Sequence, residues 1–127
     1  MANTALVLHT RDGESKAYEL CKILNANGID SSHIGSTFGK TERDSSETLV
    51  RQLIDDWDTI VIVVSPGLFA SCALRFGIAY ALGKGKPLVS VEDRSPFTTL
   101  VPTWFHDLFP KNYTEAEILT KLREVLS

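Results

Sequence analysis

The clearest secondary-structure signal in the chain is a charge-free apolar run at residues 59–64, Thr59-Ile60-Val61-Ile62-Val63-Val64. β-Branched side chains favour strands, and a run without polar alternation is typical of a strand buried on both faces. We therefore expect this segment at the centre of a sheet covered by helices on both sides. A second apolar run, Ala5-Leu6-Val7-Leu8, predicts another buried strand near the start of the chain.

Helical periodicity separates the strands. Apolar residues spaced i, i+3, i+4, i+7 predict an amphipathic helix that Asn27-Gly28 ends; they are Ala17, Leu20, Cys21 and Leu24. Further helices are expected at 44–57, from the turn after residue 67 to about residue 82, and at 114–125, where Thr114 and Glu117 form a capping box. Residues 29–34 predict a more polar edge strand, and residues 88–91 a further strand.

Strands that alternate with helices indicate βαβ units and a parallel sheet. Right-handed crossovers then predict a small doubly wound α/β fold with three layers, α/β/α. The sheet is expected to have four or five strands in the flavodoxin-like order 2-1-3-4-5. Ligands of such folds bind at the carboxyl ends of the strands, so the loops at 9–15, 35–44, 65–71 and 92–104 are the candidate site.

The length, charge and composition of the chain indicate how many domains it has and which classes of protein it does not belong to. The 127 residues fit one domain, 1–127, and the net charge of 13 − 16 = −3 argues against a dedicated nucleic-acid binder. No apolar run has the length of a membrane span, and the N-terminus lacks a signal-peptide pattern. Cys21 and Cys72 fall on apolar helix faces, which suits a reducing compartment. We expect a cytoplasmic protein.

Several motifs also have simpler interpretations. Residues 35–41 approach a phosphate-binding P-loop but have three residues between the glycines where four are needed, so a surface loop is favoured. Ser65-Pro66-Gly67 lies where a strand meets a helix, and it either binds an anion or shapes the turn and caps the helix. The three histidines, His9, His33 and His106, lie in different loops without metal-ligand spacing, so no metal is expected.

Three blocks of the sequence resemble the TIR-like domains of bacteria and, more distantly, nucleoside 2-deoxyribosyltransferase-like proteins. They are Leu8-His9-Thr10-Arg11-Asp12, then residues 58–66 with Phe69-Ala70-Ser71, and residues 75–87, which begin Arg75-Phe76-Gly77. The resemblance as a whole runs from about residue 5 to 105. A phosphorylatable Asp at the end of residues 59–64, which a response-regulator receiver needs, is absent.

The resemblance implies chemistry on NAD. Active members of the family cleave the bond between nicotinamide and ribose through a Glu on the third helix, which binds the ribose and stabilises positive charge at the anomeric carbon, as carboxylates do in glycosidases. The matching position here is Gly77, or Arg75 in the deoxyribosyltransferase register, so no carboxylate is supplied. Asp12, Glu92 and Asp93 are the candidates to replace it.

We therefore expect a domain that binds a nucleotide-type ligand or mediates assembly without the usual catalytic Glu, and that needs no cofactor. The alternative is an active NAD glycohydrolase or nucleoside N-glycosidase with a displaced carboxylate. The predicted ligand contacts are Thr10, Arg11, Asp12, Ser65 and Ser71. Thr10 and Ser65 would donate hydrogen bonds, Arg11 would offset phosphate charge, and Asp12 would either cap the first helix or touch the ligand.

Two further surfaces are candidates for binding partners. The resemblance implies self-association and gating through the 35–44 loop, at Gly35, Phe38, Gly39 and Lys40. Such domains are often fused to sensor modules in bacterial defence systems. The aromatic residues Trp104, Phe105 and Phe109 form either a partner surface or a lid packed on the sheet, and the lid is favoured.

Overall fold

The computed structural model describes residues 4–34, 51–65, 67–68, 72–92, 103–109 and 113–126. Within these residues four parallel strands form one sheet, in the order β2-β1-β3-β4. The strands are β1 (Thr4–Leu8), β2 (Asp30–Ile34), β3 (Thr59–Val64) and β4 (Leu88–Glu92). The predicted α/β fold is confirmed, with β2 at the edge and all six residues of β3 buried. A single parallel bridge from Val91 to Tyr113 lies where a fifth strand was expected.

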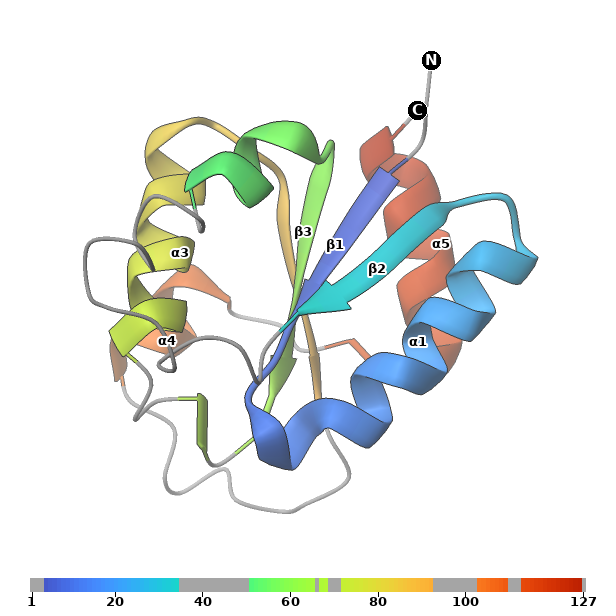
Figure 1. Cartoon of the computed structure of the whole chain (residues 1–127), viewed down its shortest axis with the longest axis horizontal. Helices are drawn as coiled ribbons and strands as arrows, with labels where there is room; N and C mark the ends of the chain where they lie inside the picture. Colours follow the sequence, from blue (N-terminus) through green and yellow to red (C-terminus); the bar gives the residue numbers. More distant parts are fainter. Residues whose placement is uncertain are drawn as a thin grey trace.

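Helices cover both faces of the sheet, as Figure 1 shows. On one face lie α1 (Glu14–Ala26) and α5 (Glu115–Leu126), and on the other lie α3 (Cys72–Gly83) and α4 (Thr103–Leu108). Residues 51–56 are also helical. A short 3-10 helix, η1 (Arg11–Gly13), leads from the end of β1 into α1. The three-layer arrangement is the one that the alternating strands and helices predict.

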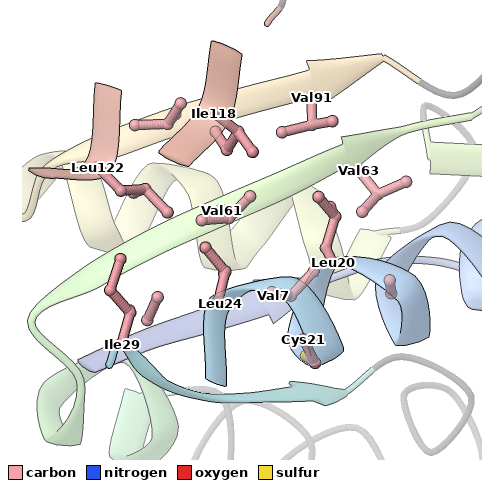
Figure 2. Packing of buried hydrophobic residues seen from close by; sticks show 13 residues of the cluster. Val7, Leu20, Cys21, Leu24, Ile29, Val61, Val63, Val91, Ile118 and Leu122 are labelled. Atoms are coloured by element: carbon pink, nitrogen blue, oxygen red, sulfur yellow. The ribbon is translucent and has the colours of Figure 1, made fainter. Parts of the chain in front are cut away.

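Alternate residues of each strand divide the core in two. Val7, Val61 and Val63 face α1 and α5, and Figure 2 shows this side of the core with Leu20, Leu24, Ile118 and Leu122 packed against the strands. Leu6, Leu8, Ile60 and Ile62 face α3 and α4. This period of two is the geometry of a strand with two buried faces, and it explains why the central strands contain no polar alternation.

Helix ends largely follow the sequence signals. α1 ends at Ala26, and Gly28 follows with φ of 84°, a conformation that glycine adopts without steric cost. At the start of α5 the Glu117 carboxylate accepts a hydrogen bond from the Thr114 backbone N–H at 3.1 Å, as a capping box requires. The predicted helix start at Asp44 lies outside the described residues.

Candidate functional site

The carboxyl ends of β1 and β3 lie side by side at the centre of the sheet. From β1 the chain continues to β2 on one side, whereas from β3 it continues to β4 on the other side. This reversal is the topological switch point at which open α/β sheets bind ligands. Residues 9–13 follow β1 at this point, and Ser65, Gly67 and Leu68 follow β3.

One carboxylate joins the two loops. Asp12 Oδ2 accepts a hydrogen bond from the Gly67 backbone N–H at 2.8 Å, and Asp12 Oδ1 accepts one from Ser65 Oγ at 2.9 Å. Thr10 Oγ1 also donates to Asp12 Oδ1 and lies 2.9 Å from Ser65 Oγ. We call Thr10, Asp12, Ser65 and Gly67 the Asp12 cluster. It connects residues more than fifty positions apart in the sequence.

The cluster favours an ionised Asp12. Burial raises the pKa of Asp12, but the hydrogen bonds from Thr10, Gly67 and Ser65 together lower it below the ordinary value of 3.8. The hydroxyls of Thr10 and Ser65 contact each other, and each also contacts Asp12 Oδ1. Each hydroxyl has one hydrogen to donate, so at most two of these three contacts are hydrogen bonds at one time. The hydroxyls can therefore redistribute their hydrogens while the carboxylate remains an acceptor.

Two glycines allow the loops to approach this closely. A Cβ atom on Gly67 would lie 2.7 Å from Asp12 Oδ1, closer than real contacts of this kind, and a tight 3.1 Å from Thr10 Oγ1. A Cβ atom on Gly13 would lie 3.1 Å from Val63 Cγ1 and 3.4 Å from Ser65 Oγ. The absence of side chains at both positions is thus part of the geometry of the cluster.

At the Ser65 turn, which was predicted as a possible anion site, one backbone donor already has an acceptor within the chain. The Gly67 N–H that a bound anion would use is already paired with the Asp12 carboxylate. The alternative interpretation is that this segment shapes the turn and caps the helix. The Ser65 carbonyl oxygen accepts a hydrogen bond from the Leu68 backbone N–H at 3.0 Å, which favours a role in the turn, while the Ser65 hydroxyl contacts Thr10 and Asp12. The turn at this point therefore holds an anion that belongs to the chain itself.

Other site predictions have different outcomes. Asp12 does not cap the first helix, since neither η1 nor α1 has a side-chain cap at its N-terminus. Thr10 and Ser65 were predicted as donors to a ligand, but their hydroxyls contact Asp12 and each other. Arg11 is exposed in η1. Several predicted site and loop residues lie outside the described residues, namely Ser71, Asp93, Gly35, Phe38, Gly39 and Lys40.

Sequence reasoning missed a histidine pair beside the cluster. His9, which is 1% exposed, places Nε2 at 2.9 Å from His33 Nδ1 and Nδ1 at 2.8 Å from the Thr10 carbonyl oxygen. A carbonyl only accepts, so His9 carries its hydrogen on Nδ1, and in the neutral ring Nε2 accepts from His33. The pKa of His9 is lowered from its ordinary value, mainly because the ring is buried and to a smaller extent because His33 is close. The hydrogen bond to the Thr10 carbonyl raises this pKa but does not outweigh the burial. The prediction that these histidines are scattered is therefore wrong for His9 and His33.

The helix expected to carry the catalytic Glu is α3. Gly77 is buried in it, and Arg75 is exposed. Glu92 is the last residue of β4, but its side chain lies outside the described part, as Asp93 does. Of the three proposed substitutes, only the Asp12 carboxylate is placed, and it lies at the carboxyl edge of the sheet.

Two kinds of feature are missing from the described residues. Across these segments no three His, Cys, Asp or Glu side chains are grouped as a metal site requires. None of the helices in the described segments combines the length and the apolar character that crossing a membrane requires.

Comparison with solved structures identifies the fold. The TIR domain of the Toll-related receptor TRR-2 from Hydra magnipapillata superposes with a TM-score of 0.64, covering 96% of this chain and 90% of that one at 13% identity. The RPS4 and RRS1 TIR domain heterodimer gives a TM-score of 0.67, with 97% and 98% covered at 14% identity. This chain has a TIR-like fold.

The solved structure of a glycosidase is also similar to this chain. The CMP N-glycosidase BcmB from Clostridium botulinum superposes with a TM-score of 0.54, covering 93% of this chain and 98% of that one at 19% identity. No protein-family model and no curated protein matches the sequence. The resemblance carried by the three sequence blocks is thus confirmed at the level of the TIR-like fold.

Proposed function

We propose that this TIR-like domain binds a ribonucleotide-type ligand at the Asp12 cluster. The observation that carries the proposal is the position of a partly exposed carboxylate at the switch point between β1 and β3, with its pKa held low by three donors. Open α/β sheets bind ligands at such a switch point, and an ionised carboxylate is suited to accept hydrogen bonds from the hydroxyl groups of a ribose. The nucleotide named for the structurally similar CMP N-glycosidase supports the same ligand class.

The charge of the cluster decides which part of a nucleotide it would contact. An ionised carboxylate attracts hydroxyl donors and cations but repels a phosphate. We therefore assign the sugar to Asp12 and place the phosphate away from the Gly67 turn. Arg11, which neighbours Asp12 in the chain and is exposed, remains the proposed phosphate contact.

A second candidate function is N-glycosidic hydrolysis with Asp12 in the role of the missing Glu. A carboxylate that stays ionised at neutral pH can stabilise the positive charge that develops on the anomeric carbon. Its low pKa makes it unsuitable as a general acid, so the leaving base would have to depart without a proton from Asp12. A cationic leaving base such as the nicotinamide of NAD meets this condition, because it departs as a neutral molecule.

We propose in addition that the domain associates with further copies of itself. One structural neighbour is a heterodimer of two TIR domains, which supports association as a use of this fold. The predicted surface, the 35–44 loop, lies outside the described residues and stays a prediction.

Binding and turnover can be tested with one set of variants. Calorimetric titration with NAD, ADP-ribose and CMP should show binding by the wild type and a loss of about tenfold in Asp12→Asn, since a charge-assisted hydrogen bond is replaced by a neutral one. Asp30→Asn is the matched control, because Asp30 is exposed at the opposite, amino edge of β2. Equal affinity of the two variants for every probe would contradict the assignment.

Nicotinamide release from NAD, followed by chromatography, separates the two functions. Release that falls in Asp12→Asn but not in Asp30→Asn would support hydrolysis through Asp12. Binding without release would support a binding domain.

A further inference from the structure

A chain of contacts leads from β2 through two histidines to the Asp12 cluster. His33, near the end of β2, has Nδ1 at 2.9 Å from Nε2 of His9, which follows β1. His9 Nδ1 in turn donates to the Thr10 carbonyl oxygen at 2.8 Å. The hydroxyl of the same Thr10 contacts Asp12 and Ser65. The histidine pair is therefore joined to the cluster through one residue.

The contact between the two rings tolerates one additional proton but not two. His9 Nε2 accepts the hydrogen that His33 carries on Nδ1. A first proton, added at His33 Nε2, leaves this donor and this acceptor unchanged. A second proton has to enter at His9 Nε2, where it converts the acceptor into a donor. Two N–H groups and two positive charges then face each other across 2.9 Å, so the contact breaks.

Burial makes the second proton more disruptive. His9 is 1% exposed, and a buried charge without a partner is costly. The His9 ring, once charged and separated from His33, is therefore expected to turn toward water. That movement withdraws Nδ1 from the Thr10 carbonyl oxygen and releases the residue whose hydroxyl belongs to the Asp12 cluster.

Charged groups of η1 and α1 act on the buried ring as well. Burial is the main cause of the lowered pKa of His9, and the nearby His33 lowers it further. The Thr10 hydrogen bond and the carboxylates of Glu14 and Asp12 raise this pKa without outweighing the burial. These two carboxylates therefore make the second proton less unfavourable than burial alone would make it.

The other ring is packed against α1. The Tyr18 ring meets His33 edge-on, with the ring centroids 6.3 Å apart. The Lys22 ammonium lies 5.3 Å from the centroid of the same Tyr18 ring. A cation on this side of the pair opposes the accumulation of further positive charge.

We propose that the His9–His33 pair is a pH-sensitive switch of the Asp12 cluster, which stays intact with up to one added proton and is released by the second. Histidine ordinarily changes its charge between about pH 5 and pH 8, so the switch operates within this range. The consequence for ligands rests on the nucleotide binding proposed above: the ligand is held at neutral pH and released on acidification. By linkage, a bound ligand equally opposes the uptake of the second proton.

The coupling between pair and cluster is tested in the protein without ligand. NMR spectra between about pH 7.5 and pH 5 follow the two imidazole rings and the Gly67 amide hydrogen, which is donated to Asp12. The Gly67 signal should shift at the pH at which His9 takes up its second hydrogen. Titration of Asp12 itself falls below pH 3.8 and does not interfere. Circular dichroism should show a folded protein throughout this range.

His33→Asn tests whether the pair causes this step. The Asn amide can replace Nδ1 as the donor to His9 Nε2, and after a flip its carbonyl can accept from a protonated Nε2. A proton on His9 then breaks no contact, so the Gly67 step should be lost. His106→Asn is the matched control, because it also removes one histidine but lies on α4, at the opposite face of the sheet. It should keep the step.

Calorimetric titration with ADP-ribose at both ends of the pH range tests the effect on the ligand. Its diphosphate stays fully ionised over this range, so the pH dependence comes from the protein. The wild type and His106→Asn should lose about tenfold in affinity at the lower pH, because one linked proton changes the binding constant by up to about tenfold per pH unit. His33→Asn should lose less than about twofold.

The outcomes separate the switch from the proposed function. A Gly67 signal that stays constant while His9 is protonated overturns the coupling, and so does a pair that remains intact down to about pH 5. A step that His33→Asn retains overturns the pair as its cause. A wild type that shows the Gly67 step but binds no nucleotide at either pH overturns the proposed binding, whereas the switch of the cluster stands. The wild-type spectra test the coupling even where a variant fails to fold.

Discussion

Asp12 Oδ2 accepts a hydrogen bond from the Gly67 backbone N–H at 2.8 Å, across 55 positions of the chain. The turn after a central strand offers a backbone donor to anions, and here the chain supplies the anion itself. Because the same carboxylate also accepts from Ser65, it fixes the loop after β1 against the loop after β3. The candidate site is thus an exposed carboxylate held by donors of the other loop rather than an empty phosphate-binding turn.

Gly67→Ala tests how closely the two loops must approach. The new Cβ would lie 2.7 Å from Asp12 Oδ1, so the carboxylate must shift, and we expect a loss of about 1–3 kcal/mol in the free energy of unfolding. Gly83→Ala is the control, since a Cβ there meets nothing within 4 Å, and a helical Ala stabilises by up to about 1 kcal/mol. Urea unfolding of both variants measures the difference. Equal stabilities would contradict the steric argument.

Asp12→Asn tests the charge of the cluster through pH. The Asn carbonyl can still accept from Gly67, and its amide can donate to the hydroxyls, so the contacts persist while the charge is lost. The pKa of Asp12 is 3.8 in the unfolded chain and lower in the folded protein. The ionised carboxylate therefore contributes its full stabilisation at pH values above 3.8, and this stabilisation is lost as the pH falls through the pKa of the folded protein. The wild type should therefore exceed the variant in stability at neutral pH, and the difference should shrink below pH 3.8. A difference independent of pH would show that the charge is not involved.

His9→Asn tests the buried histidine. Its amide can replace Nδ1 as the donor to the Thr10 carbonyl, but it does not titrate. Since the folded pKa of His9 is lowered from 6.5, the unfolded chain binds a proton first as the pH falls, and the wild type loses stability below pH 6.5. The variant should lack this part of the loss. Nitrogen-15 NMR of the wild type should show the His9 hydrogen on Nδ1, and a hydrogen on Nε2 alone would overturn the assigned hydrogen bonds.

Lys86→Met tests a cation at a helix end. Lys86 Nζ donates to the Trp57 carbonyl oxygen at 2.7 Å and to the Asp55 carbonyl oxygen at 3.3 Å, at the end of the helical segment 51–56. Its removal should cost about 1–2 kcal/mol in the free energy of unfolding. Lys84→Met serves as the control, because the exposed Lys84 ammonium lies 3.8 Å from Asp55 and exposed pairs contribute about 0–1 kcal/mol. Thermal unfolding distinguishes the two variants.

Most of the fold follows from local patterns. The apolar run at 59–64 predicts a buried central strand, and β3 lies between β1 and β4. The spacing of Ala17, Leu20 and Leu24 predicts the buried face of α1. These features are predictable because burial on one or both faces imposes a period on the sequence itself. Beyond β4 the described residues show an isolated bridge between Val91 and Tyr113 in place of a fifth strand, and a single bridge imposes no alternating pattern on the sequence.

The candidate site was only partly predictable. Because parallel strands end at one edge, the sequence could place Thr10, Asp12 and Ser65 near each other. It could not show that the donors of the Ser65 turn and the Asp12 carboxylate satisfy each other, because that depends on side-chain geometry across two loops. The His9–His33 pair had a usable signal, since each residue lies at the end of one of two strands expected to be neighbours.

The Asp12 cluster also bears on how the protein folds. Its contacts between the two loops join residues 53 to 55 positions apart, so none of these can form before β1 and β3 have paired in register. Contacts of such long sequence separation form late, after loop-closure entropy has been lost. A ligand that needs this cluster would therefore bind only the completed β1–β3 pair and would stabilise the native state by mass action without supporting partly folded chains.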